Sequence, residues 1–266
     1  MNPAFIKEDW LTPLLNDIQI KILCANDISE PLPNTQIFHI QKITTGKAFA
    51  EQVIRHSISR THFLIIYDND GISAPLLWFQ FLYFGHALNN LSIIKGGYKS
   101  WQGAKGHLIR PKSGSSSSYS ATPQIQMRIR KDELIEFCRQ LQDSVIVSKI
   151  AGKYPIPSQR KPKFSQLIDC RDCSENIFPG AINISWSIFI IDDITVPNIA
   201  IFDEKKVNVE QGIIIVGDTM DHCAIVAFNA YLRCGEIDKI QIYFENIQDL
   251  MGTFLTDNTF QYQTSE

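Results

Sequence analysis

The sequence lacks the features that mark several large classes of protein. No apolar stretch approaches the ~20 residues that a membrane-spanning helix needs. The opening residues, MNPAFIKEDWL, lack the basic and apolar segments of a secretory signal. With a net charge of −3, the chain also lacks the basic excess of a nucleic-acid-binding surface. These absences predict a cytoplasmic protein that binds neither membranes nor nucleic acid.

Cysteine is present, but without the spacing of a metal site. Among the six cysteines, Cys170 and Cys173 form a CxxC motif, and no second CxxC accompanies it as a structural zinc site would require. Pro179-Gly180 follows soon afterwards, whereas a thioredoxin-like motif opens a helix. We interpret the motif as two incidental thiols at a strand end, reduced in the cytosol. The sequence thus predicts no metal and no cofactor.

The chain has the composition and length of a globular protein with two domains. It has 266 residues, 44% of them hydrophobic and 20% charged. A serine-rich stretch from Ser113 to Ser118 has the composition of a flexible linker. We therefore predict an N-terminal domain at residues 1–110, a linker at 111–130 and a C-terminal domain at 131–266.

Strand and helix patterns alternate along both halves. The predicted strands are 17–25, 36–41, 62–67, 90–94, 166–169, 212–217 and 239–243. A turn plus strand is predicted within 178–186, and residues 145–150 are expected to be extended. The predicted helices lie within 1–16, at 47–56, 75–84 and 131–142, and in the segment between residue 218 and Gly235, with a further short helix that runs through Trp101. This alternation predicts an α/β fold in which each domain has a mostly parallel sheet with helices on both faces.

One strand, loop and helix pattern occurs twice. The segments 62–85 and 212–235 each read as a short buried strand, a tight loop and a helix closed by glycine. The matching pairs, each 150 residues apart, are Asp68 with Asp218, Ala74 with Ala224, and Gly85 with Gly235. A repeat of this length indicates two similar domains, because solenoid repeats have periods of about 20–50 residues.

The second loop is the predicted functional site. Loops at the carboxyl ends of parallel strands carry the ligand sites of α/β folds, and the N–H groups that open a helix favour anions. The candidate residues are Asp218, Thr219, Met220, Asp221, His222 and Cys223. Several of these are metal-ligand types, but a cluster within six residues rarely forms a complete metal site.

These motifs together resemble the tandem-domain rhodaneses, of the thiosulfate or 3-mercaptopyruvate sulfurtransferase type. In the first half the resemblance rests on Trp10-Leu11, Ile65-Ile-Tyr-Asp68, Trp78, Phe84-Gly85-His86 and Gly96-Gly97-Tyr98 with Trp101. In the second half it rests on Leu167-Ile-Asp169-Cys-Arg171, Phe178-Pro-Gly-Ala-Ile-Asn183 and the segment from Ala224 to Gly235. The resemblance covers nearly the whole chain and implies two rhodanese-like domains.

The resemblance also implies where the chemistry would lie. In the family the first domain is usually inactive and often carries aspartate at its loop start, as Asp68 does here. The second loop normally opens with a cysteine, whose thiolate accepts a sulfane sulfur as a persulfide. Alignment on Ala224 places Asp218 there, and a carboxylate cannot form a persulfide. Arg171 stands where the family often contacts substrate.

The departure at Asp218 leaves three hypotheses open. The first is a binding or regulatory pseudoenzyme that lacks ordinary sulfur transfer. The second is a sulfurtransferase that forms its persulfide on Cys223, near the start of the helix, with His222 as a neighbouring base. The third is an interaction scaffold. The expected partner is accordingly a small sulfur-containing anion or another protein.

Overall fold

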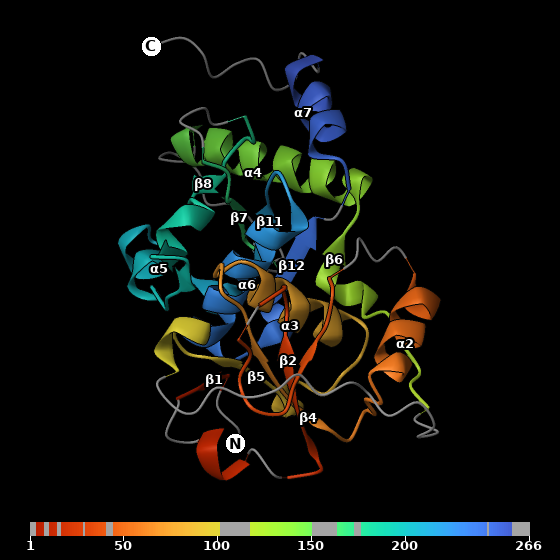
Figure 1. The fold of residues 1–266 in the computed structure, drawn as a ribbon. Coiled ribbons are helices and arrows are strands. Elements are labelled where there is room, and N and C mark those ends of the chain that lie inside the picture. The colour runs from red at the N-terminus through yellow and green to blue at the C-terminus, as the bar shows by residue number, and fades with distance from the viewer. Residues whose placement is uncertain are drawn as a thin grey trace. The chain divides into compact units, whose positions relative to one another are not determined.

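The computed structural model describes residues 4–7, 11–14, 17–28, 30–40, 45–101, 118–150, 164–172, 177–243 and 245–256. The chain forms two compact units (Figure 1). The first unit consists of residues 1–125 and 189–197, and the second of residues 126–188 and 198–266. The second unit is thus interrupted in the sequence by a short segment that belongs to the first.

The first unit is built on a five-stranded parallel sheet. Its strands are β1 (Phe5–Ile6), β2 (Ile20–Cys24), β3 (Thr35–Ile37), β4 (Phe63–Tyr67) and β5 (Leu91–Ile94), in the order β1-β5-β4-β2-β3. Its helices are α2 (Gly46–Arg55) and α3 (Ser73–Tyr83), with 3-10 turns at Thr12–Leu14, Leu88–Asn90 and Tyr98–Ser100.

The second unit has a sheet of the same topology. Its strands are β6 (Arg128–Ile129), β7 (Gln166–Asp169), β8 (Ile182–Asn183), β11 (Ile213–Val216) and β12 (Ile240–Tyr243), in the parallel order β6-β12-β11-β7-β8. Its helices are α4 (Lys131–Ile150), α5 (Ala200–Glu204), α6 (Met220–Cys234) and α7 (Ile247–Thr256). Short 3-10 turns lie at Val209–Gln211 and Ile237–Lys239, and those at Ile125–Met127 and Trp186–Phe189 include residues where the chain passes between the two units.

The sequences of the central strands and helices explain their positions. Strand β4 reads FLIIY and β11 reads IIIV, and their near-continuous apolar side chains are buried as expected for strands covered on both faces. Helix α3 is aromatic, and Trp78, Phe79 and Phe81 are fully buried. Helix α2 is amphipathic instead, and the Thr45 side chain caps it by accepting a hydrogen bond from the Ala48 N–H.

The predicted α/β architecture is confirmed, with some differences in the elements. Residues 145–150 were expected to be extended because Val145, Ile146 and Val147 favour strands, but helix α4 runs through them to Ile150. The helix propensity of valine and isoleucine is only tenths of a kcal/mol per residue below that of better helix formers, so the preceding turns of α4 prevail. Within 1–16, the expected helix falls partly on residues 8–10, which lie outside the described residues. Leu11 is helical and a 3-10 turn follows it, while β1 lies before this segment.

The predicted linker at 111–130 falls partly on residues 111–117, which lie outside the described residues. In the described remainder, three side chains are buried and most of the others are exposed or half-buried. Tyr119 is buried in the first unit and its ring stacks on that of His86, while Met127 and Ile129 are buried in the second. The units meet in sequence at residues 125 and 126. No helix in the described part of the chain has both the length and the apolar character to cross a membrane.

An antiparallel hairpin accounts for the interruption of the second unit. Its strands are β9 (Ile190–Ile191) and β10 (Ile194–Thr195), and its turn residues Asp192 and Asp193 both have positive φ, at 51° and 59°. Two such residues define the turn whose twist suits a two-residue hairpin. The hairpin lies on the loop after β4, where the Thr195 hydroxyl donates a hydrogen bond to the Gly71 carbonyl.

Candidate functional site

The predicted loop lies at the carboxyl end of β11, between β7 and β12. Gly217, Asp218 and Thr219 connect the strand to α6. Thr219 is the N-cap of this helix, since its hydroxyl accepts a hydrogen bond from the His222 N–H. The helix ends at Gly235, which has a left-handed conformation with φ of 73°. The strand, loop and helix pattern predicted from the sequence is therefore confirmed.

The candidate side chains of this loop do not converge on one point. Asp218 and Thr219 are exposed, Met220, Asp221 and His222 are half-buried, and Cys223 is fully buried. Because α6 already begins at Met220, the last four of these residues lie on its first turn. Among the described residues, no group of three or more histidine, cysteine or acidic side chains could hold a metal ion.

His222 stacks on the ring of Trp186. The two ring centroids lie 4.1 Å apart and the planes differ by 6°. Among the described residues, the His222 side chain forms no hydrogen bond with Cys223. The backbone N–H of His222 donates to the Thr219 hydroxyl. A role for His222 as a base acting on Cys223 therefore has no support in this geometry.

Cys223 lies beside the thiol of Cys170, a contact that was not predicted from the sequence. Its Sγ atom lies 3.7 Å from the Sγ atom of Cys170, which follows β7. Contact with Cys223 and burial raise the pKa of Cys170 well above its ordinary value. Cys170 lies at a strand end, as predicted, while Cys173 of the same motif lies outside the described residues. The signal that could have found the pair is the parallel register of β7 beside β11.

Gly217 makes room for these two sulfur atoms. A Cβ atom at residue 217 would lie 2.4 Å from the Sγ atom of Cys170 and 2.9 Å from that of Cys223. Real Cβ atoms do not approach other atoms so closely, so a side chain at this position would displace the thiols. The close packing of the two thiols therefore requires glycine at residue 217.

The Arg171 side chain is buried and forms an ion pair with Asp169. Its Nε and Nη2 atoms donate to the two carboxylate oxygens of Asp169 at 2.9 and 2.6 Å. The guanidinium carbon lies 4.9 Å from the ring centroid of Phe178, and Nη1 lies 3.4 Å from the Met251 sulfur. The side chains of Arg171 and Asp169 are only 5% and 2% exposed.

Asn183 completes this arrangement at the end of β7. Its side-chain amide donates to the carbonyl oxygens of Asp169 and Arg171, each at 3.0 Å. The paired motifs that carried the resemblance, Asp169 to Arg171 and the turn ending at Asn183, thus bind each other. In this chain these residues hold together the carboxyl ends of β7 and β8.

The loop of the first unit encloses an acid. Asp68 is only 2% exposed, and its Oδ2 atom accepts a hydrogen bond of 2.7 Å from the Ala74 N–H at the start of α3. Burial, followed by the neighbouring Asp70 carboxylate, raises the pKa of Asp68 to about 7. Gly97 has φ of 55° and approaches the Asp68 carbonyl so closely that a Cβ there would lie 2.9 Å away. The predicted Gly96-Gly97 turn is thus a structural turn.

The hydrogen-bond register shows how the two loops correspond. The Ala25 N–H donates to the Tyr67 carbonyl, and the Cys170 N–H donates in the same way to the Val216 carbonyl. Tyr67 also pairs with Cys24 as Val216 pairs with Asp169. Tyr67 and Val216 therefore hold equivalent places.

It follows that Gly217 is equivalent to Asp68 in the sheet register, and Asp218 lies one residue further along. The pairing of Asp68 with Asp218, which the sequence alignment without a gap suggested, differs from this register by one residue. The buried space that the Asp68 side chain occupies in one unit corresponds to the space beside Gly217 that two cysteine sulfurs fill in the other.

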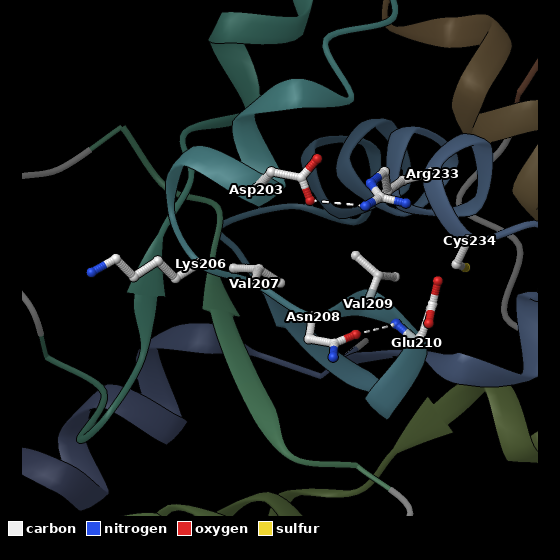
Figure 2. A pocket seen from close by; sticks show the side chains of 8 residues that line it. All are labelled: Asp203, Lys206, Val207, Asn208, Val209, Glu210, Arg233 and Cys234. Atoms are coloured by element: carbon white, nitrogen blue, oxygen red, sulfur yellow. Dashed lines mark hydrogen bonds and ion pairs between the residues drawn. The ribbon is translucent and has the colours of Figure 1, made fainter.

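A cavity of ≈ 380 Å³ lies elsewhere in the second unit, at the amino end of β11 (Figure 2). Its lining residues are Asp203, Lys206, Val207, Asn208, Val209, Glu210, Arg233 and Cys234. The charges of Arg233 and Asp203 are paired at 2.9 Å. Glu210 precedes β11 and Arg233 lies near the end of α6. The cavity therefore lies at the amino ends of the strands, whereas the candidate loop follows the carboxyl end of β11.

Comparisons with solved structures identify the fold. The chain aligns with SseA of Escherichia coli, described as a 3-mercaptopyruvate sulfotransferase with the rhodanese fold, at 18% identity and a TM-score of 0.63, covering 92% of this chain and 99% of that one. It aligns with Tum1 of Saccharomyces cerevisiae at 14% identity and a TM-score of 0.65, covering 97% and 98%.

A third similar structure is the anaerobic ergothioneine biosynthesis enzyme of Chlorobium limicola. The identity is 14% and the TM-score 0.66, with 91% of this chain and 66% of that chain covered. No family model and no curated protein sequence matches. The chain therefore has the tandem rhodanese fold, as its motifs predicted.

Proposed function

We propose that this chain is a rhodanese-fold protein without ordinary sulfur transfer, which acts by binding or regulation. One observation carries the proposal: neither residue that can open the second loop is a cysteine. The sequence alignment suggests Asp218 for this position, and the sheet register supports Gly217. A persulfide requires a thiol, and neither residue provides one.

The electrostatics of the loop support this proposal. Asp218 and Asp221 place two carboxylates at the loop, and no lysine or arginine follows Asp218 until Arg233. Arg171, the nearby cation that the resemblance marked, is neutralised by Asp169 at 2.6 Å. A small sulfur-containing anion such as 3-mercaptopyruvate would meet net negative charge there. We therefore favour a protein partner over such an anion, in a protein that we expect in the cytosol.

The alternative function is sulfur transfer through a persulfide on Cys223. Its position on the first turn of α6 favours it, because helix N-termini accommodate negative charge. Its burial opposes it, since the Sγ atom faces Cys170 and Gly217 rather than an open pocket. A donor would have to reach a sulfur that the fold has enclosed.

A sulfur-transfer assay separates the two functions. The intact protein is incubated with thiosulfate or 3-mercaptopyruvate and with cyanide or a thiol as acceptor. We expect no rate above that of buffer. A rate that Cys223→Ser abolishes and Cys138→Ser retains would overturn the proposal in favour of the alternative. Mass spectrometry of the donor-treated protein gives a second readout, since the alternative requires one added sulfur atom on the peptide that contains Cys223.

A further inference from the structure

Cys170 and Cys223 form a buried thiol pair that the proposed function does not use. They are 53 residues apart in sequence, and their Sγ atoms lie 3.7 Å apart. Both side chains have no exposed area. We propose that this pair is a redox site, at which a water-sized peroxide converts the two thiols to a reversible disulfide. This inference goes beyond the proposed binding function and does not depend on it.

The surroundings of the pair favour a bond between the two sulfurs. The missing side chain of Gly217 leaves space in which both Sγ atoms lie close together. The strand end that carries Cys170 is fixed by the hydrogen bonds of Asn183 to its neighbours. Closing the remaining gap thus requires a small shift of the first turn of α6, which carries Cys223 and follows exposed loop residues.

The burial of both sulfurs selects the oxidant. Neither side chain has any exposed area, so a bulky disulfide reagent such as oxidised glutathione cannot contact the sulfurs of the folded protein, whereas hydrogen peroxide is close to water in size. The raised pKa of Cys170 keeps this group in the thiol form at neutral pH. Because the thiolate is the reactive form, oxidation of the folded protein should be slow.

The reaction balances with peroxide as the two-electron oxidant. One cysteine sulfur attacks a peroxide oxygen, the O–O bond breaks, and the released hydroxide takes the thiol proton as water. The second sulfur then attacks the resulting sulfenic sulfur, the S–S bond forms, and the hydroxyl group leaves with the second thiol proton as water. Two thiols are oxidised to one disulfide, and one peroxide is reduced to two waters.

The disulfide would change the site at which it forms. It would join the end of β7 to the first turn of α6 and enclose the connection from Gly217 to Thr219. That connection contains the exposed Asp218, so the conformational freedom of the candidate loop would depend on the redox state. A thiol such as dithiothreitol would restore the reduced form by exchange.

Peptide mapping of the intact protein tests the proposal. Folded protein is incubated with hydrogen peroxide, quenched with catalase, denatured in iodoacetamide and digested with trypsin. Cleavage after lysine and arginine separates the relevant cysteines: Cys170 lies in 164–171, Cys173 in 172–205, Cys223 in 207–233 and Cys234 in 234–239. We expect the peptides 164–171 and 207–233 to appear joined, with the loss of two hydrogens, and to separate after dithiothreitol.

The same treatment in urea is the control, because the unfolded chain has no reason to favour this pair. Recovery of both peptides in alkylated form after treatment of folded protein would overturn the proposal, as would a share of this pair among the disulfides formed that is no higher than in urea. Linkage of Cys170 to Cys173 instead would also overturn it. Gly217→Ala should lower the yield by displacing the sulfurs, with Gly252→Ala as the matched change. The mapping of unsubstituted protein stands even if Gly217→Ala does not fold.

Discussion

The Nη2 atom of Arg171 lies 2.6 Å from the Oδ2 atom of Asp169, and both side chains are buried. A buried ion pair contributes little compared with an apolar replacement of both partners, but the loss of one partner leaves an uncompensated charge. Each charge of the pair therefore compensates the free-energy cost of burying the other at the end of β7.

Substitution of one partner tests this interpretation. Arg171→Met should destabilise the second unit by about 3–5 kcal/mol, measured by urea unfolding followed by circular dichroism. Arg233→Met is the matched control, because Arg233 pairs with Asp203 at an exposed position and surface pairs contribute little. Equal unfolding midpoints for the two variants would contradict the structural role assigned to Arg171.

The contact of Gly217 with the two thiols predicts a rescue. Gly217→Ala should destabilise the protein by about 1–3 kcal/mol, as overpacking commonly does, because the new Cβ would lie 2.4 Å from the Cys170 sulfur. The double variant Gly217→Ala with Cys170→Ala should recover part of that loss. A double-mutant cycle of unfolding free energies measures the coupling, and additive effects would show that the glycine acts independently of the sulfur.

Asp68 predicts a dependence of stability on pH. Its pKa is raised to about 7 in the folded protein, against about 4 in an unfolded chain. Between these values Asp68 binds more protons in the folded state, so its contribution to stability should be fully present below pH 4 and be lost as the pH rises towards 7. For one proton the slope is at most about 1.4 kcal/mol per pH unit.

Asp68→Asn removes the titrating group while its amide oxygen can still accept from the Ala74 N–H. Unfolding free energies measured from pH 4 to pH 8 should be flatter in this variant than in the unsubstituted protein. Asp218→Asn removes an exposed carboxyl instead and controls for the change in net charge. A profile for Asp68→Asn that falls as steeply as the original would assign the pH dependence to other groups.

Gly71 should be intolerant of a side chain because of the hairpin. Its φ is 71°, and a Cβ there would lie 2.8 Å from backbone atoms of Ile194 and Thr195. Gly71→Ala should destabilise the first unit by about 1–3 kcal/mol. Gly252 lies in α7 with nothing within 4 Å of an added Cβ, so Gly252→Ala should be neutral or stabilising. Thermal unfolding of both variants compares them, and equal midpoints would argue against the hairpin contact.

Much of the fold could be predicted because the central strands are short apolar runs bounded by turn residues. Residues 166–169 and the strand ending at Tyr67 are clear examples. The error at 145–150 has a different origin, since β-branched residues there indicated a strand and the established helix continued. The hairpin went unrecognised although isoleucine and threonine flank Asp192-Asp193, because acidic pairs suggest a hairpin turn less strongly than Asn-Gly does.

The strand, loop and helix around the candidate site could be predicted more accurately than the contacts of its side chains. The loop after β11 was found from the repeat, and the burial of Cys223 agrees with a small residue facing the core. Its partner Cys170 was missed, because contact between residues so far apart in sequence depends on the register of β7 beside β11, which the sequence prediction did not include. The role of Arg171 likewise depends on rotamers: the same arginine can point outwards to a ligand or fold back onto Asp169.

The excursion of residues 189–197 has a consequence for dividing the protein into fragments. A fragment that ends at residue 125 lacks the hairpin that lies on Gly71, and a fragment that begins at residue 126 carries a hairpin whose binding surface is missing. No single cut in the gene therefore yields two complete units. Isolated residues 1–125 should gain stability when a peptide of residues 186–198 is added in trans, because the peptide supplies the missing strand pair as a ligand does.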